Sequence, residues 1–196
     1  AGGKNPEKER LQEMSTEQNM NTTQETGMAQ KAGTAQVHTI APVYNENSRI
    51  LILGSFPSVK SREQGFFYGH PRNRFWKVLA GITEAPVPVA VEEKKNFLLE
   101  HRIAVWDVIA ACTIRGSSDS SIRDVVPVDL TPILETAKIQ RIFTNGSTSD
   151  RLYQKYLKPA TGMEAVRLPS TSPANAAFSY EQLCEEWKIC LSFLKD

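Results

Sequence analysis

The stretch that most constrains the fold is residues 49–76, which read RILILGSFPSVKSREQGFFYGHPRNRFW. It begins with four consecutive apolar residues, Ile50 to Leu53, and the run ends at Gly54. A short continuous apolar run is typical of a strand that is buried on both faces of a parallel sheet. We therefore expect a strand here, followed by a long polar loop. Because open α/β sheets bind ligands at the carboxyl ends of their strands, this loop is the first candidate binding region.

Strand-like and helix-like patterns alternate along the rest of the chain, as a doubly wound α/β layer requires. Further strands are expected at residues 103–108, 141–146 and 165–168, and helices at residues 73–80, 92–100, 129–137, 147–157 and 179–194. Asp129 and Ser147 are the expected caps of two of these helices. Residues 113–124 are expected to form a polar loop after the second strand.

The predicted fold class is therefore α/β, a three-layer α/β/α sandwich with a central, mainly parallel sheet of about four strands. If the strands are joined by right-handed crossovers, the loops that follow all four strands gather at one edge of the sheet. The turn after Asp107, the NGS turn at residues 145–147 and the segment 169–175 would then lie beside the loop that follows Gly54.

Composition divides the 196-residue chain into a tail and a domain. Residues 1–36 contain no aromatic residue, Val or Ile, and their only apolar side chains larger than Ala are Leu11, Met14, Met20 and Met28. These side chains are too few to offset the conformational entropy of ordering the segment. We expect residues 1–36 to be a flexible or weakly docked tail and residues 37–196 to be a single domain. Leu11 and Met14 stand at helical spacing, so a short docked helix is the alternative.

Several classes of protein are disfavoured. No apolar run approaches the roughly 20 residues that a membrane span needs, and no signal-peptide hydrophobic region is present at the amino terminus. The three cysteines show no CxxC spacing, which disfavours a zinc or iron–sulfur site. We expect an intracellular protein with reduced thiols, no membrane partner, no metal and no cofactor. For a prokaryote, the expected location is the cytoplasm, in association with the nucleoid.

Positive charge is concentrated in residues 55–77, where five basic residues stand against the single acidic residue Glu63, a local net charge of +4. Aromatic residues are interspersed with these charges: Phe66, Phe67, Tyr68, Phe75 and Trp76. One interpretation is an ordinary solvated loop. The other is a surface for a polyanion that also offers stackable rings, namely a nucleic acid.

Four segments carry a resemblance to a known family: GSFPSVKS at residues 54–61, FFYGHPRNRFW at 66–76, VWDV at 105–108 and LPSTSPAN at 168–175. Together they resemble the uracil-DNA glycosylase superfamily, most closely its hypoxanthine-DNA (deoxyinosine) glycosylases and next its mismatch-specific uracil and thymine glycosylases. The resemblance spans residues 50–194. It implies a monofunctional DNA glycosylase that removes a deaminated base, most closely hypoxanthine, from double- or single-stranded DNA. It also implies a monomer.

The resemblance assigns two catalytic residues, Asn73 and Ser170. Asn73 is the asparagine of the HPxNxFW segment, and its amide would orient the attacking water or a base edge; helix capping is its other expected role. Ser170 stands where relatives carry a His or Asn that supports the departing oxygen. Phe56 is a departure, because many relatives place an Asp or Asn there to handle the water.

Base binding is assigned to Asp107 and to the aromatic residues Phe56, Phe66, Phe67 and Tyr68. A carboxylate at Asp107 accepts hydrogen bonds only, which suits the ring N–H of hypoxanthine, and a turn cap is its alternative role. For each aromatic residue, burial in the core is the alternative.

DNA contacts are assigned to small polar and basic residues. Ala174 is too small to wedge into a duplex, and Asn175 is the candidate to fill part of that gap. The assigned contacts are Ser58, Arg62, His70, Arg72, Arg74, Lys77, Thr171, Ser172 and Asn175.

Two alternatives stay open beside the hypoxanthine glycosylase. One is a mismatch-specific uracil/thymine-DNA glycosylase. The other is a catalytically silent nucleic-acid-binding module that kept the fold and lost the carboxylate of its first motif. Phe56 favours the silent module, whereas Asn73, Asp107 and the second motif favour the enzyme.

Overall fold

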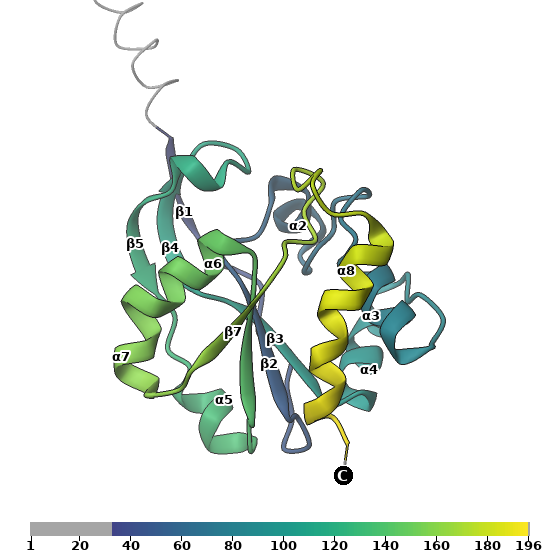
Figure 1. Ribbon diagram of the computed structural model, residues 1–196. Coiled ribbons are helices and arrows are strands. Elements are labelled where there is room, and N and C mark those ends of the chain that lie inside the picture. The colour runs from purple at the N-terminus through teal and green to yellow at the C-terminus, as the bar shows by residue number, and fades with distance from the viewer. Residues whose placement is uncertain (1–32, 196) are drawn as a thin grey trace, which may run out of the picture.

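A four-stranded sheet forms the centre of the computed structural model, which describes residues 33–195 (Figure 1). Its strands are β2 (Ile50–Gly54), β3 (Ile103–Asp107), β6 (Arg141–Asn145) and β7 (Ala165–Leu168), in the order β3-β2-β6-β7. The pairings β2–β3, β2–β6 and β6–β7 are all parallel. Each strand ends within one residue of its predicted end, and the predicted α/β class with a four-stranded, mainly parallel sheet is confirmed.

Both faces of this sheet are covered, as the continuous apolar run of β2 predicts. Ile50 and Ile52 face a core layer with α3 (Phe75–Thr83), α4 (Val91–Glu100) and α8 (Tyr180–Trp187). Leu51 and Leu53 point to the other face, because successive side chains of a strand alternate. That face packs on α5 (Thr131–Thr136), α6 (Ser147–Leu152) and the π-helical turn Tyr153–Leu157, which leads into α7 (Lys158–Thr161).

A second sheet was not predicted. It is antiparallel, in the order β1-β4-β5, and consists of β1 (Thr34–Val37), β4 (Ile109–Ile114) and β5 (Arg123–Pro127). Cys112 and Ile114 of β4 add to the core beneath Leu51 and Leu53. Parts of β4 and β5 lie in the segment that was expected to be a loop, since its many Ser, Gly and charged residues conceal the short strands at its ends.

The predicted domain boundary at residue 36 is corrected by β1. Thr34, Ala35 and Gln36 pair with Ile114, Thr113 and Cys112 of β4, so the domain includes residues assigned to the tail. The remaining prediction of a tail, and its alternative of a docked helix at Leu11 and Met14, lie outside the described residues.

The helices follow their predicted positions with shifted ends. Ser179 caps α8 through a capping box, and the last turns continue as a 3₁₀ helix, Lys188–Phe193, rather than as α-helix. The Asp129 carboxylate accepts a hydrogen bond from the Thr131 amide (2.9 Å) before α5. One short helix, α2 (Val59–Gln64), was not predicted. None of the helices in residues 33–195 is long and apolar enough to cross a membrane.

The carboxyl ends of the parallel strands meet at one edge, as predicted. Gly54 stands beside Asp107 in the pairing of β2 with β3, and Asn145 stands beside Leu168 in the pairing of β6 with β7. The loops that follow these residues enclose a cavity.

Candidate active site

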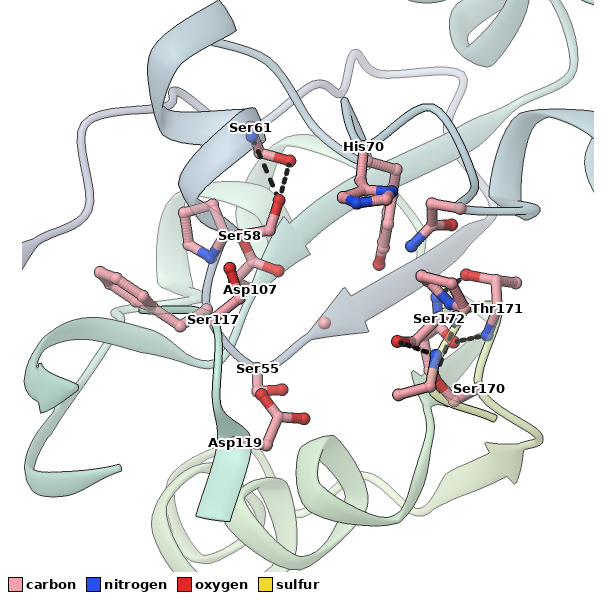
Figure 2. Close-up of a pocket in the computed structure, with 18 of the residues that line it drawn as sticks. Ser55, Ser58, Ser61, His70, Asp107, Ser117, Asp119, Ser170, Thr171 and Ser172 are labelled. Atoms are coloured by element: carbon pink, nitrogen blue, oxygen red, sulfur yellow. Dashed lines mark hydrogen bonds between the residues drawn. The ribbon is translucent and has the colours of Figure 1, made fainter. Parts of the chain in front are cut away.

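The cavity at this edge has a volume of about 540 Å³, within the usual range of small-molecule sites (Figure 2). All four strand-end loops contribute to it, and so does the loop between β4 and β5. Its lining residues are 54–58, Ser61, Phe67, Tyr68, His70, Asn73, Asp107, 117–120, Asn145 and 170–174. Thus the segments that resemble the two family motifs are brought together in one hollow.

Asp107 is a buried carboxylate in this lining, 3% exposed. Its Oδ2 lies 2.7 Å from Nε2 of His38, and the two side chains are almost completely buried. The amide of Ile40 donates to Nδ1 of the same imidazole (3.2 Å). Since Nδ1 accepts a hydrogen bond, Nε2 carries the proton and donates it to Asp107. The Asp107 side chain bonds to His38 and does not cap the following turn, which was its alternative role.

The Asp107 carboxylate lies against Gly54, which has no side chain to clash with it. A Cβ at position 54 would collide with Oδ1 of Asp107 and lie 3.0 Å from the Tyr68 hydroxyl. The second carboxylate oxygen and the phenol therefore converge above the backbone of Gly54. An acceptor and a donor stand close together at this point of the cavity wall.

Tyr68 presents its hydroxyl to the site rather than a free ring face. Its backbone has a φ of 53°, and its ring stacks on Phe75 with centroids 3.9 Å apart. The hydroxyl is buried beside the side-chain amide of Asn145, whose oxygen and NH₂ group also bond to Thr171. Burial, reinforced by the charge of Asp107, raises the pKa of Tyr68 above its usual range. The phenol therefore remains protonated and is a donor.

Phe56 and Phe67 line the cavity as predicted, but Phe66 does not. Phe66 is 3% exposed and stacks on Trp76 in the core, with ring centroids 6.0 Å apart. Phe66 therefore has the core position that was its alternative role, and it does not line the cavity.

Asn73 lines the cavity and also caps α3. Its Oδ1 accepts a hydrogen bond from the amide of Phe75 (2.9 Å), the first residue of that helix. The partner is an N–H donor, so the bonded atom must be the oxygen of the carboxamide. The bond lies at the start of α3, one residue before the N-cap position, Arg74, which has no side-chain capping bond of its own. The group that remains for the cavity is the NH₂, which donates hydrogen bonds.

The loop of the second motif is held by its own polar groups. Oγ of Ser170 accepts from the amide of Ser172 (3.1 Å), and Nδ2 of Asn175 donates to the Ser170 carbonyl (3.0 Å). Gly146, with a φ of 98°, lets Ser170 come close, since a Cβ there would lie 3.0 Å from the Ser170 Cβ. Ser170 thus reaches the cavity with its hydroxyl proton still available.

Thr171 is tied inward instead of toward DNA. Its amide donates to Oδ1 of Asn145 and its Oγ1 accepts from Nδ2 of Asn145, both at 3.0 Å. The residue is fully buried. In this structure Thr171 joins the second-motif loop to the end of β6, and its predicted contact with DNA stays a prediction.

Asp119 is a second carboxylate of the lining, from the loop between β4 and β5. Figure 2 shows it beside Ser55, on the side of the cavity away from Ser170. Although the residue as a whole is exposed, burial of its carboxyl group and the charge of Asp107 raise its pKa, against the opposing effects of Ser55, Arg151 and Thr148. Within residues 33–195, no three His, Cys, Asp or Glu side chains are grouped to hold a metal ion.

Comparison with known proteins assigns this architecture to a family. The model of the uracil DNA glycosylase superfamily matches residues 41–195. The chain belongs to this superfamily.

Similar proteins come from two species of Methanosarcina. The chain is 38% identical to the hypoxanthine DNA glycosylase of Methanosarcina acetivorans over 148 residues, which are 74% of this chain and 92% of that protein. It is 34% identical to the hypoxanthine DNA glycosylase of Methanosarcina barkeri over 136 residues, 68% of this chain and 85% of the relative. A solution NMR structure from M. acetivorans, described as a candidate uracil DNA glycosylase, superposes with a TM-score of 0.71 at 33% identity and covers 83% of this chain and 100% of its own.

The basic residues of this superfamily member differ in how much they are already engaged. Arg74 donates to the carbonyl oxygens of Ser172 (3.1 Å), Asn175 (2.9 Å) and Phe178, so its guanidinium holds the second-motif loop in place. Arg72 and Lys77 are exposed and remain candidates for phosphate contact.

The other assigned contacts near the first motif are partly engaged. Arg62 donates to the Gly116 carbonyl (3.1 Å) and lies 5.4 Å from the ring centroid of Phe56. Ser58 uses its hydroxyl to cap α2, where it accepts from the amide of Ser61 (3.1 Å). His70 lines the cavity, and its Nδ1 accepts from the amide of Arg72 (3.1 Å).

Sequence reasoning missed three polar groups of this glycosylase-like site: His38, Asp119 and Asn145. His38 lies just beyond the predicted tail, and Asp119 is one acid in a Ser-rich segment. Asn145 had the clearest signal, because it ends a predicted strand at the edge where the loops converge.

Proposed function

We propose that this protein is a monofunctional DNA glycosylase that hydrolyses the N-glycosidic bond of a deaminated base, with hypoxanthine as its preferred base. Two relatives carry the name hypoxanthine DNA glycosylase. The observation that carries the proposal is the buried carboxylate of Asp107, held by His38 in the cavity wall. The enzyme acts as a monomer on double- or single-stranded DNA, in the cytoplasm.

Asp107 reads the base edge in this proposal. Hypoxanthine carries a ring N–H beside a carbonyl group. Oδ1 of Asp107 accepts the N–H, and the hydroxyl of Tyr68 is the neighbouring donor for the carbonyl. Adenine carries an unprotonated ring nitrogen at the position of the ring N–H, so the Asp107 carboxylate would face a second acceptor and be left unpaired. Sites built on specific hydrogen bonds reject such analogues strongly.

Asn73 supports the departing base. Its oxygen accepts a hydrogen bond from the Phe75 amide, and its NH₂ group supplies N–H donors to the cavity. As the glycosidic bond breaks, negative charge develops on the purine ring, and a preorganised donor stabilises that charge more than it stabilises the ground state. Ser170 adds a hydroxyl donor to the lining of the same cavity.

Apolar walls complete the site. Phe56 and Phe67 line the cavity and exclude water from a base that has left the duplex. A purine covers more of these walls than a pyrimidine does, which favours hypoxanthine over uracil.

One alternative function has a specific observation in its favour. Uracil and thymine also present a ring N–H beside a carbonyl, so Asp107 alone does not reject them. A mismatch-specific uracil/thymine glycosylase is therefore the second candidate. The silent binding module, which Phe56 favoured, has no support from Asp107, because a merely retained fold needs no buried carboxylate at the cavity wall.

The test is an excision assay on labelled duplexes that each carry one inosine, uracil, xanthine or G:T mismatch, with an undamaged duplex as control. Abasic sites are revealed by alkali. We expect the inosine strand to be cut after alkali treatment and to stay intact without it, because a monofunctional glycosylase releases the base but does not cut the strand. The Asp107→Asn variant should narrow the difference between inosine and adenine, because its amide can both donate and accept. Absence of release from every duplex would contradict the proposed function.

A further inference from the structure

Hydrolysis at a sugar carbon needs a group that handles the attacking water, and the expected position for one in this cavity is occupied by Phe56. The hydrocarbon ring of Phe56 cannot accept a proton. Asn73 cannot do so either, because a carboxamide is not basic enough to take a proton from water. A group for the water must therefore come from elsewhere in the lining.

His70 is a poor candidate for this base. Its Nδ1 accepts a hydrogen bond from the Arg72 amide (3.1 Å), so in the neutral ring the proton resides on Nε2. The nitrogen that remains is a donor. Two carboxylates are left in the lining, Asp107 and Asp119.

Neither oxygen of Asp107 is available to bind the water. One of its oxygens is bound to His38, and the other lies above Gly54 beside the Tyr68 hydroxyl, in the position that suits a base edge. Asp119, by contrast, lies beside Ser55 in the cavity wall (Figure 2), and the hydroxyls of Ser55 and Thr148, which lower its pKa, are groups that a water molecule can share. Ser55 directly precedes Phe56 in the chain. The loop between β4 and β5 thus brings a carboxylate to the part of the first motif that has none (Figure 2).

The loop that carries Asp119 is docked onto the first motif. Oγ of Ser117 accepts a hydrogen bond from the Val59 amide (3.0 Å), and the Gly116 carbonyl accepts from Arg62 (3.1 Å). Within the loop, Oγ of Ser121 accepts from the Arg115 amide (2.9 Å) and donates to the Ser118 carbonyl (2.7 Å). Asp119 is therefore held in place by contacts on both sides of its loop.

We propose that Asp119 is the general base that positions and deprotonates the hydrolytic water, an inference that rests on the glycosylase function proposed above. The water oxygen bonds to the sugar C1′ as the bond from C1′ to the base breaks, and the bonding electron pair leaves with the base. Asp119 takes one proton from the water. That proton passes through solvent to the departing base, so the products are a neutral base and an abasic sugar with a hydroxyl at C1′.

The electrostatic surroundings of Asp119 fit this role. The charged groups that influence it are Asp107 on β3 and Arg151 on α6. Burial and Asp107 raise its pKa, with Arg151 opposing, and a carboxylate of raised pKa is a stronger base once it is ionised. The two negative charges also favour the positive charge that develops on the sugar.

The experiment measures single-turnover release from an inosine duplex as a function of pH, because a base with a raised carboxyl pKa gives the rate profile an acid limb. The variants are Asp119→Asn and the matched control Asp124→Asn, an exposed carboxylate on β5. We expect Asp119→Asn to release base about 10²-fold more slowly and to lose the acid limb of the profile, a change that a merely structural role does not produce. Asp124→Asn should match the unmodified protein.

Failure of this inference is separable from failure of the proposed function. If the unmodified protein releases hypoxanthine and Asp119→Asn keeps both its rate and its acid limb, Asp119 is not the base and the glycosylase function stands. If the unmodified protein releases no base from any of the duplexes, both the proposed function and the role of Asp119 are wrong.

Discussion

His38 donates its Nε2 proton to Oδ2 of Asp107 across 2.7 Å, although the two residues stand 69 positions apart in the chain. The bond joins the end of β1 to the end of β3 and uses one oxygen of the carboxylate. It therefore fixes the direction of the other oxygen, which lies above Gly54. His38 acts on the base through Asp107 and is a positioning residue.

Replacement of His38 tests this relationship. We expect His38→Ala to lose discrimination between inosine and adenine, because Asp107 is free to rotate, and to lower stability by about 1–3 kcal/mol, the cost of a buried unsatisfied group. His38→Gln, whose amide N–H reaches a similar position, should retain most of both. Release rates on the two duplexes and thermal melting measure the effects. An Ala variant with unchanged discrimination would show that Asp107 needs no support.

Asn73 has two separable roles, and two variants divide them. Asn73→Asp keeps an oxygen for the Phe75 amide but removes the NH₂ donor, whereas Asn73→Ala removes both. Single-turnover release should fall strongly in both variants, with little change in duplex binding. Only Asn73→Ala should also lose the capping contact, about 0.5–2 kcal/mol of stability. If release in both variants stays within about tenfold, roughly 1.4 kcal/mol of barrier, the catalytic assignment is wrong.

Salt dependence tests the basic residues. Each phosphate contact that is removed should flatten the log–log slope of duplex affinity against salt by about 0.9. We expect this effect for Arg72→Ala and Lys77→Ala, which are exposed, and for Arg62→Ala where the part of its guanidinium not bound to Gly116 meets a phosphate. Arg74→Ala should instead reduce release, since Arg74 holds the second-motif loop. If all four variants keep the salt-dependence slope of the unmodified protein, these side chains do not contact phosphates.

Stability against pH tests the surroundings of Asp119. Burial and the charge of Asp107 raise the pKa of its carboxyl group in the folded protein, so folding favours the protonated form. The ionised form therefore costs stability above that pKa, and the cost disappears as the pH falls below the unfolded-state value of about 3.9. We expect Asp119→Asn to melt higher than the unmodified protein at neutral pH, with a difference that shrinks on acidification.

Asp129 provides a control of opposite sign. Hydrogen bonds from Thr131 lower the pKa of its carboxyl group, so its contribution to stability is present at neutral pH and is lost on acidification. Asp129→Ala should melt lower than the unmodified protein at neutral pH. A melting temperature of Asp119→Asn below that of the unmodified protein would contradict the raised pKa.

Local patterns were enough to predict the central sheet. All four strands end within one residue of their predicted ends. A short apolar run, such as Ile50 to Leu53, is enough to identify a buried parallel strand. Their common edge followed from the handedness of the crossovers. The convergence of Gly54, Asp107 and Ser170 on one cavity was therefore predictable without coordinates.

The parts that were missed depend on contacts between distant residues or on side-chain direction. The pairing of β1 with β4 joins residues about as far apart as His38 and Asp107, and neither strand has a strong pattern of its own. Phe66 and Phe67 are adjacent and chemically identical, so only their directions decide which one lines the cavity. Which atom of the Asn73 amide faces the cavity depends on a single hydrogen bond to the backbone.

The most direct test of the central claim is a competition in one reaction, in which the unmodified protein meets equal amounts of an inosine duplex and a uracil duplex of the same sequence, each with its own label. Alkali then reports the two excision rates side by side. The account predicts faster release at inosine, because Asp107 and Tyr68 read an edge that both bases share while Phe56 and Phe67 cover more of a purine. Equal or faster release of uracil would contradict it and place the protein with the mismatch-specific uracil glycosylases.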